Sequence, residues 1–104
     1  MKLINTDIEG LFIVEPIIFR DDRGFFFESY SEKKFQDQNV NINFVQDNRS
    51  LSSYGTIRGL HMQANPKTQT KLISVLSGHI LDVVVDCRKD SKTYKEVRTF
   101  ELDS

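Results

Sequence analysis

The residues best suited to chemistry lie in one short segment, Arg58-Gly59-Leu60-His61-Met62-Gln63, and at Lys71, which follows His61 by ten positions. Histidine is the side chain best able to accept a proton near neutral pH. The guanidinium of Arg58 and the ammonium of Lys71 can hold phosphate and stabilise developing negative charge. Together these residue types favour an enzyme that removes a proton from an anionic substrate.

The bulk composition argues against several other classes of protein. The chain has 104 residues, which predicts a single domain over 1–104 with one modest core. A net charge of −1 gives no reason to expect nucleic-acid or membrane binding. No apolar run approaches the roughly 20 residues of a membrane helix. The single cysteine, Cys87, cannot form an internal disulfide, and no signal peptide is evident, so we expect a soluble, cytoplasmic protein.

Short apolar or alternating runs separated by turn-like residues dominate the chain and predict strands. We expect these strands over residues 11–16, 24–30, 43–46, 56–63, 71–76, 79–86 and 96–102. Ser77-Gly78 predicts a tight hairpin between two of them. One short helix is expected over residues 32–38, with Ser31 as its cap. The separators are too short for crossover helices, which favours an all-β antiparallel sandwich or barrel.

The position of Asp82 allows two interpretations. Alternation places it on the same strand face as Ile80 and Val84. If this face lines a barrel interior, the carboxylate needs a partner such as Lys71 or His61. Alternatively, Asp82 faces solvent on an amphipathic strand.

The local geometry around His61 poses a related question. Strict alternation along residues 56–63 would place Arg58 and His61 on opposite faces, although both are candidates for one pocket. A bulge or kink at Gly59 would resolve the conflict, because glycine is the residue expected at such a distortion.

Five segments then carry a resemblance across the chain, namely residues 22–30, 44–50, 57–63, 71–73 and 81–86. Their order and spacing are similar to those of the dTDP-4-dehydrorhamnose 3,5-epimerase family. The resemblance implies an all-β, antiparallel, cupin-like jelly-roll barrel. It also implies an isomerase of dTDP-rhamnose biosynthesis, which converts dTDP-4-dehydro-6-deoxy-D-glucose to dTDP-4-dehydro-L-rhamnose without a metal or organic cofactor.

The resemblance assigns roles to individual residues. His61 would be the base that removes a proton beside the 4-keto group, and Lys71 would stabilise the enolate oxygen. Asp82 is a possible supporting residue because of its strand position, if that face lines the barrel interior. Substrate-binding contacts are implied for Phe19, Arg23, Phe26, Glu28, Gln46, Asp47, Asn48 and Arg58. Family members are usually homodimers that exchange N-terminal strands, so Phe19, Arg23, Phe26 and Glu28 would reach the pocket of the partner subunit.

The end of the chain leaves other functions open. Family members continue beyond Ser104 and there supply a catalytic tyrosine and an acidic partner for the histidine. We therefore expect an incomplete barrel, and activity of the 104-residue form is left open. The alternatives are a non-catalytic sugar-nucleotide-binding or oligomerisation module, a related ketoisomerase, or a single-site epimerase. A metal-dependent cupin is disfavoured because His61 and His79 are the only histidines.

Overall fold

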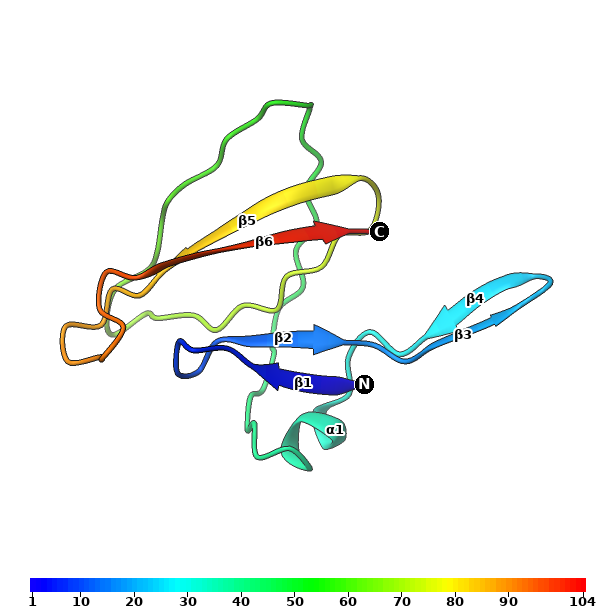
Figure 1. Cartoon of the computed structure of the whole chain (residues 1–104), viewed down its shortest axis with the longest axis horizontal. Helices are drawn as coiled ribbons and strands as arrows, with labels where there is room; N and C mark the ends of the chain where they lie inside the picture. Colours follow the sequence, from blue (N-terminus) through cyan, green and yellow to red (C-terminus); the bar gives the residue numbers. More distant parts are fainter. The chain divides into compact units, whose positions relative to one another are not determined.

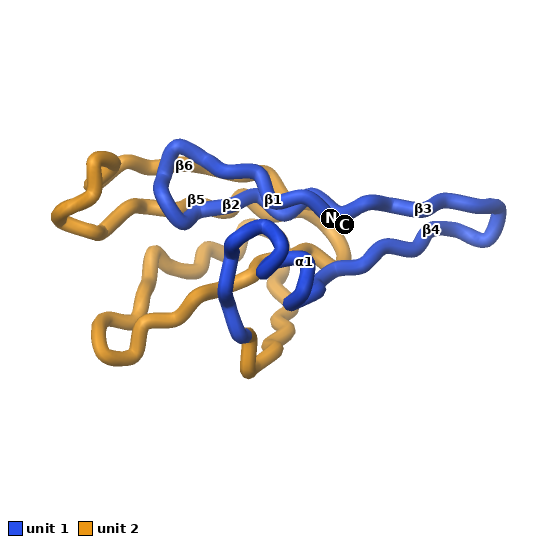
Figure 2. Tube along the Cα trace, turned by 90° about the horizontal axis from the view of Figure 1, so that it is seen from below, with its two compact units in different colours: residues 1–43 blue, residues 44–104 orange.

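The computed structural model describes residues 1–104, which form antiparallel strand pairs and one short helix (Figure 1). The strand pairs are β1 (Lys2–Asn5) with β2 (Phe12–Glu15), β3 (Ile18–Asp21) with β4 (Gly24–Phe27), and β5 (His79–Val85) with β6 (Val97–Asp103). The chain divides into two units, residues 1–43 and residues 44–104 (Figure 2). The expectation of a mainly β, antiparallel protein is thus confirmed. No helix has the length and apolar character needed to cross a membrane.

The first unit begins with a hairpin that is closed by one side chain. Thr6 follows β1, and its hydroxyl donates to the Leu11 carbonyl at 2.9 Å and accepts the Ile8 N–H at 3.2 Å. The Thr6 N–H also bonds the Leu11 carbonyl, at 3.2 Å. These bonds satisfy backbone groups that the β1–β2 ladder leaves unpaired. Ile8 at the tip of this loop is one of the few buried apolar side chains.

The helix α1 (Glu32–Gln36) forms where its local signals predict it. The hydroxyl of Ser31 caps it by accepting the Lys34 N–H at 3.4 Å, and Glu32 occupies the first turn, where negative charge is favourable. Phe35 is the one side chain that the helix buries. Its ring meets the ring of Tyr30 edge-on, with 5.3 Å between the two centroids. After the helix, Gln38 accepts the N–H of Leu3 at 2.9 Å, which ties this segment to β1.

The second unit contains the strands that differ most from expectation. Residues 44–78 form no strand, so the strands expected over 43–46, 56–63 and 71–76 are wrong. The tight hairpin at Ser77-Gly78 is wrong as well, because β5 pairs with β6. Apolar alternation supplies side chains for a strand, but a strand also needs a neighbour to take its backbone hydrogen bonds. Within this chain no strand pairs with residues 44–78.

A buried carboxylate organises the loop between β5 and β6. The side chain of Asp86 is only 1% exposed. It accepts hydrogen bonds from Arg88 at 2.7 Å, from Ser91 at 2.6 Å and from Thr93 at 2.7 Å. The Asp86 carbonyl also accepts the N–H of Lys95 at 2.8 Å, which joins the two ends of the loop next to β5 and β6. These donors, Arg88 first, hold the pKa of Asp86 far below its usual value.

We expect Asp86→Asn to lower the thermal unfolding midpoint at pH 7. A carboxyl whose pKa is lower in the folded state stabilises the fold above its unfolded pKa, about 3.9. That stabilisation is lost as the pH falls from about 4 towards the folded pKa. The difference between the wild type and Asp86→Asn should therefore be largest near neutral pH and shrink below about pH 4. The exposed Asp90 in the same loop provides the control variant Asp90→Asn. A difference that does not depend on pH would contradict this account.

Candidate functional site

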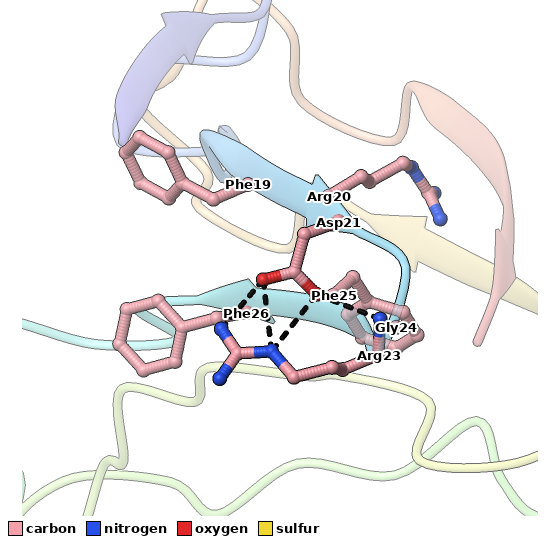
Figure 3. Close-up of a pocket in the computed structure, with 7 residues that line it drawn as sticks. All are labelled: Phe19, Arg20, Asp21, Arg23, Gly24, Phe25 and Phe26. Atoms are coloured by element: carbon pink, nitrogen blue, oxygen red, sulfur yellow. Dashed lines mark hydrogen bonds and ion pairs between the residues drawn. The ribbon is translucent and has the colours of Figure 1, made fainter.

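The β3–β4 hairpin carries three of the residues implied in substrate binding. Phe19 and Phe26 are cross-strand partners, so their rings project from the same face. Arg23 lies in the turn, beyond the end of this face, and Figure 3 shows its side chain folded back along β4. These residues border a shallow hollow of about 460 Å³, lined by Phe19, Arg20, Asp21, Arg23, Gly24, Phe25 and Phe26. The two phenylalanines are 62% and 70% exposed.

The charge of Arg23 already has a partner within this hairpin. Its Nη2 atom lies 2.6 Å from a carboxylate oxygen of Asp21, and Nε also donates to that carboxylate (Figure 3). The Arg23 N–H bonds the same group at 2.9 Å. The pair lowers the pKa of Asp21 and raises the pKa of Arg23, so both groups are charged at neutral pH. The Arg23 side chain is 89% exposed, which leaves the outer edge of its guanidinium open to an anion.

Glu28 follows β4 and meets a lysine from the helix. The Nζ atom of Lys34 lies 2.8 Å from Glu28 Oε1, and both side chains are about half exposed. The side chain as a whole stays partly exposed, but the ion-paired atom Oε1 is itself buried and accepts no hydrogen bond.

The segment 46–48 is organised by one hydrogen bond between side chains. The amide nitrogen of Gln46 donates to the amide oxygen of Asn48 at 3.0 Å. The two side chains therefore meet, and they are exposed, as is Asp47 between them. Two amides held in one orientation present a defined set of donors and acceptors to a polar ligand.

The segment around His61 is bent at the glycine where a distortion is expected. Gly59 has φ +105°, a region that residues with a side chain rarely adopt. A Cβ atom at position 59 would lie 3.0 Å from His61 Nδ1 and 3.2 Å from the His61 backbone nitrogen. Gly59 therefore leaves the space that the imidazole occupies. A regular strand through Gly59 is not observed, so strict alternation does not apply to Arg58 and His61.

The three remaining candidates are not joined to one another. His61 and Lys71 are exposed and Asp82 is half-buried in β5, opposite Phe100. No hydrogen bond or ion pair links them, so the partner suggested for Asp82 is not seen. No group of three or more His, Cys, Asp or Glu side chains is arranged to hold a metal ion.

The structure adds partners that the sequence did not indicate. Asp21 binds Arg23, Lys34 binds Glu28, and the hydroxyl of Ser52 accepts the Nε–H of Arg58 at 3.1 Å. Asp21 stands two positions before Arg23 in a turn, a spacing that could have indicated the first pair. Ser52 stands six positions from Arg58 in an irregular segment, where no periodicity indicates a contact.

Comparison with known proteins identifies the family to which the chain belongs. The profile of the family described as dTDP-4-dehydrorhamnose 3,5-epimerase matches residues 5–104, and the chain belongs to that family. The resemblance carried by the five sequence segments is thereby confirmed.

Individual relatives agree with the family match. The dTDP-4-dehydrorhamnose 3,5-epimerase of Methanothermobacter thermautotrophicus is 46% identical over 95 residues, which cover 91% of this chain and 51% of the relative. The Shigella flexneri enzyme of the same name is 45% identical, over 90% of this chain and 52% of the relative. The chain thus spans about half the length of the curated relatives that it matches.

Solved structures of the family are also similar. A Bacillus anthracis dTDP-4-dehydrorhamnose 3,5-epimerase with TDP and PPi bound is 52% identical, with a TM-score of 0.93 over 98% of this chain and 59% of that one. A Legionella pneumophila dTDP-6-deoxy-D-glucose-3,5-epimerase in complex with dTDP-4-keto-L-rhamnose is 45% identical. Its TM-score is 0.89, over 98% of this chain and 54% of that chain.

We expect Gly59→Ala to displace the imidazole of His61. The added Cβ strains the backbone by about 1–2 kcal/mol and also meets the ring. Gly55→Ala is the matched control, because Gly55 also has a positive φ, +79°, but its Cβ would meet nothing within 4 Å. Histidine ring NMR signals measure the effect, with His79 as an internal reference. Gly59→Ala should shift the His61 signals and Gly55→Ala should not. Equal shifts in both variants would show that Gly59 gives His61 no special room.

Proposed function

We propose that the chain acts as a nucleotide-sugar 3,5-epimerase. The reaction converts dTDP-4-dehydro-6-deoxy-D-glucose to dTDP-4-dehydro-L-rhamnose, in dTDP-rhamnose biosynthesis. The observation that carries the proposal is the family match over residues 5–104, which includes the segment from Arg58 to Gln63 and Lys71. Protons on the carbons beside the 4-keto group are acidic, because their removal gives an enolate. Removal followed by return of a proton on the opposite face inverts each carbon.

The proposed chemistry divides between two side chains of the second unit. His61 is the base, and its exposed imidazole has no hydrogen-bond partner within the chain that would occupy the nitrogen needed for the proton. Lys71 is the cation that stabilises the enolate oxygen, and it is likewise unpaired. Asp82, half-buried in the same unit, is proposed to support them. No step of this scheme needs a metal or an organic cofactor.

The proposed substrate contacts are of two kinds, charged contacts to the diphosphate and hydrogen bonds to the rest of the ligand. Arg58 and Arg23 would hold the diphosphate, because guanidinium groups match phosphate oxygens with paired donors. Gln46, Asp47 and Asn48 would bind the sugar or the nucleoside. The relatives from Bacillus anthracis and Legionella pneumophila, with their nucleotide and nucleotide-sugar ligands, support a ligand of this class.

The proposal extends to fold and assembly. We propose that residues 1–104 belong to one cupin-like jelly-roll domain and that the protein is a homodimer with N-terminal strand exchange. The support is the exposed β3–β4 hairpin, whose Phe19 and Phe26 find no cover within their own unit. Phe19, Arg23, Phe26 and Glu28 would then contribute to the site of the partner subunit. The expectation of a cytoplasmic protein stays a prediction.

The test of catalysis is incorporation of solvent deuterium. Incubation with dTDP-4-dehydro-6-deoxy-D-glucose in deuterated water should label C3 and C5, as measured by mass spectrometry and proton NMR. His61→Ala should slow labelling by about 10²–10⁴-fold, the usual contribution of a general base, with little change in nucleotide affinity.

His79→Ala is the control, because His79 lies outside the proposed site. This variant should incorporate deuterium into the sugar at the wild-type rate. Binding of the sugar nucleotide without any labelling in the wild type would reject catalysis by this chain. That result would favour the alternative of a non-catalytic sugar-nucleotide-binding module. Labelling at one carbon alone would favour a single-site epimerase. A product whose carbonyl group has moved to a neighbouring carbon would favour a ketoisomerase.

Strand exchange makes a separate prediction about mixed dimers. If Arg23 serves the partner site, a dimer of one Arg23→Ala chain and one His61→Ala chain contains one site with both residues intact. Co-expression of the two variants should therefore restore deuterium labelling that neither variant supports alone. The controls are each variant by itself and the solution mass of the mixture. A dimeric mixture that is no more active than the separate variants would show that Arg23 serves the site of its own chain.

A further inference from the structure

The guanidinium of Arg58 is held by two acceptors from its own segment. Its Nε–H donates to the hydroxyl oxygen of Ser52 at 3.1 Å, and Nη2 donates to the carbonyl of Leu51 at 3.5 Å. These contacts span six and seven positions of a segment that has no helix or strand to hold it. They are therefore the interactions that fix where this exposed side chain points.

Both acceptors are neutral, which distinguishes Arg58 from other bound arginines of the chain. Arg23, Arg88 and Arg98 each contact a carboxylate, at 2.6, 2.7 and 3.1 Å. A carboxylate partner compensates the positive charge, whereas a hydroxyl and a carbonyl leave it in place. Arg58 is thus oriented and still carries an uncompensated charge.

The pattern of occupied donors shows which edge of the group is left. A guanidinium has five N–H donors, one on Nε and two on each terminal nitrogen. Ser52 and Leu51 take the edge formed by Nε and Nη2. The end edge, formed by Nη1 and the second Nη2 proton, remains for a ligand. Two parallel donors at such an edge match two oxygens of a phosphate group.

We propose that Ser52 is a positioning residue for Arg58 and so sets the affinity of the chain for a diphosphate. The inference rests on the proposed function, which assigns the diphosphate to Arg58. Arginine has a long side chain with large rotational freedom, and a ligand that immobilises it loses that entropy from its affinity. Because Ser52 holds Nε in place, much of the side-chain entropy of Arg58 is lost when the chain folds. Less entropy is then lost when the ligand binds.

The test measures binding of inorganic pyrophosphate and of TDP by isothermal titration calorimetry. Ser52→Ala should weaken both by about three- to tenfold, the effect of one side chain that is no longer held in place. Ser52→Thr keeps the hydroxyl and should bind like the wild type. Ser53→Ala is the matched control, since its side chain does not contact Arg58, and it should bind like the wild type as well.

A double-mutant cycle separates positioning from a general loss of structure. In the Arg58→Ala background, Ser52→Ala should cause no further loss, because nothing remains for Ser52 to orient. The Nε–H NMR signal of Arg58, identified by its absence in Arg58→Ala, gives a second measurement without ligand. Ser52→Ala should speed its exchange with solvent.

Several results would overturn the inference. These are unchanged pyrophosphate affinity in Ser52→Ala, losses that add in the Arg58→Ala background, or a wild-type chain that does not bind pyrophosphate. The proposed function is judged separately by deuterium labelling of the sugar. Labelling with no effect of Ser52→Ala rejects the inference alone, whereas Ser52-dependent binding of pyrophosphate without labelling rejects the epimerase and retains the inference.

Discussion

Pairing between strands that are neighbours along the chain is the constraint on which this structure depends. All three sheets are antiparallel hairpins, and each strand has one partner. Apolar burial adds little, because only Ile8, Phe35 and Val40 are buried among the hydrophobic side chains. Hydrogen bonds from polar side chains in the loops therefore help to hold the hairpins closed. Thr6 closes the first, the Asp21–Arg23 pair the second and Asp86 the third.

The residues proposed to act on the substrate lie largely outside these hairpins. Gln46, Asn48, Arg58, His61 and Lys71 all belong to the segment that forms no strand. Short-range contacts hold some of them, as between Gln46 and Asn48. His61 instead depends on the empty space beside Gly59. The groups proposed to bind the ligand are thus partly ordered in its absence, whereas the proposed base and the Lys71 ammonium have no partners within the chain.

The sequence predicted the elements whose signals are local. Ser31 and Glu32 indicated the start of the helix, and the apolar runs in β2, β4, β5 and β6 indicated those strands within a few residues. It missed β1 and β3, which become evident only through their pairing with β2 and β4. It wrongly predicted strands over residues 43–46, 56–63 and 71–76, because alternation describes side chains and not the availability of a neighbouring strand.

The candidate site divides in a similar way. Motif spacing suggested the candidate groups, whose roles stay predictions. Gly59 was expected to bend the chain for a physical reason that the positive φ supports. Apart from Asp21, whose spacing from Arg23 in a turn could have indicated their pair, the partners of those groups were not predictable from the sequence. Ser52 is the clearest example, since neither its residue type nor its separation from Arg58 along the chain indicates a contact.

The ion pair at the tip of the second hairpin has a consequence for selectivity. The Asp21 carboxylate lies 2.6 Å from the exposed guanidinium of Arg23. It therefore competes with any other anion for the hydrogen-bond donors of Arg23. Chloride or a lone carboxylate offers Arg23 no more than Asp21 already does. A diphosphate brings several oxygens and more than one negative charge, so it can share the guanidinium or displace Asp21 from it. Under the proposed function, this turn would favour a ligand of high charge density, independently of the sugar or the base that the ligand carries.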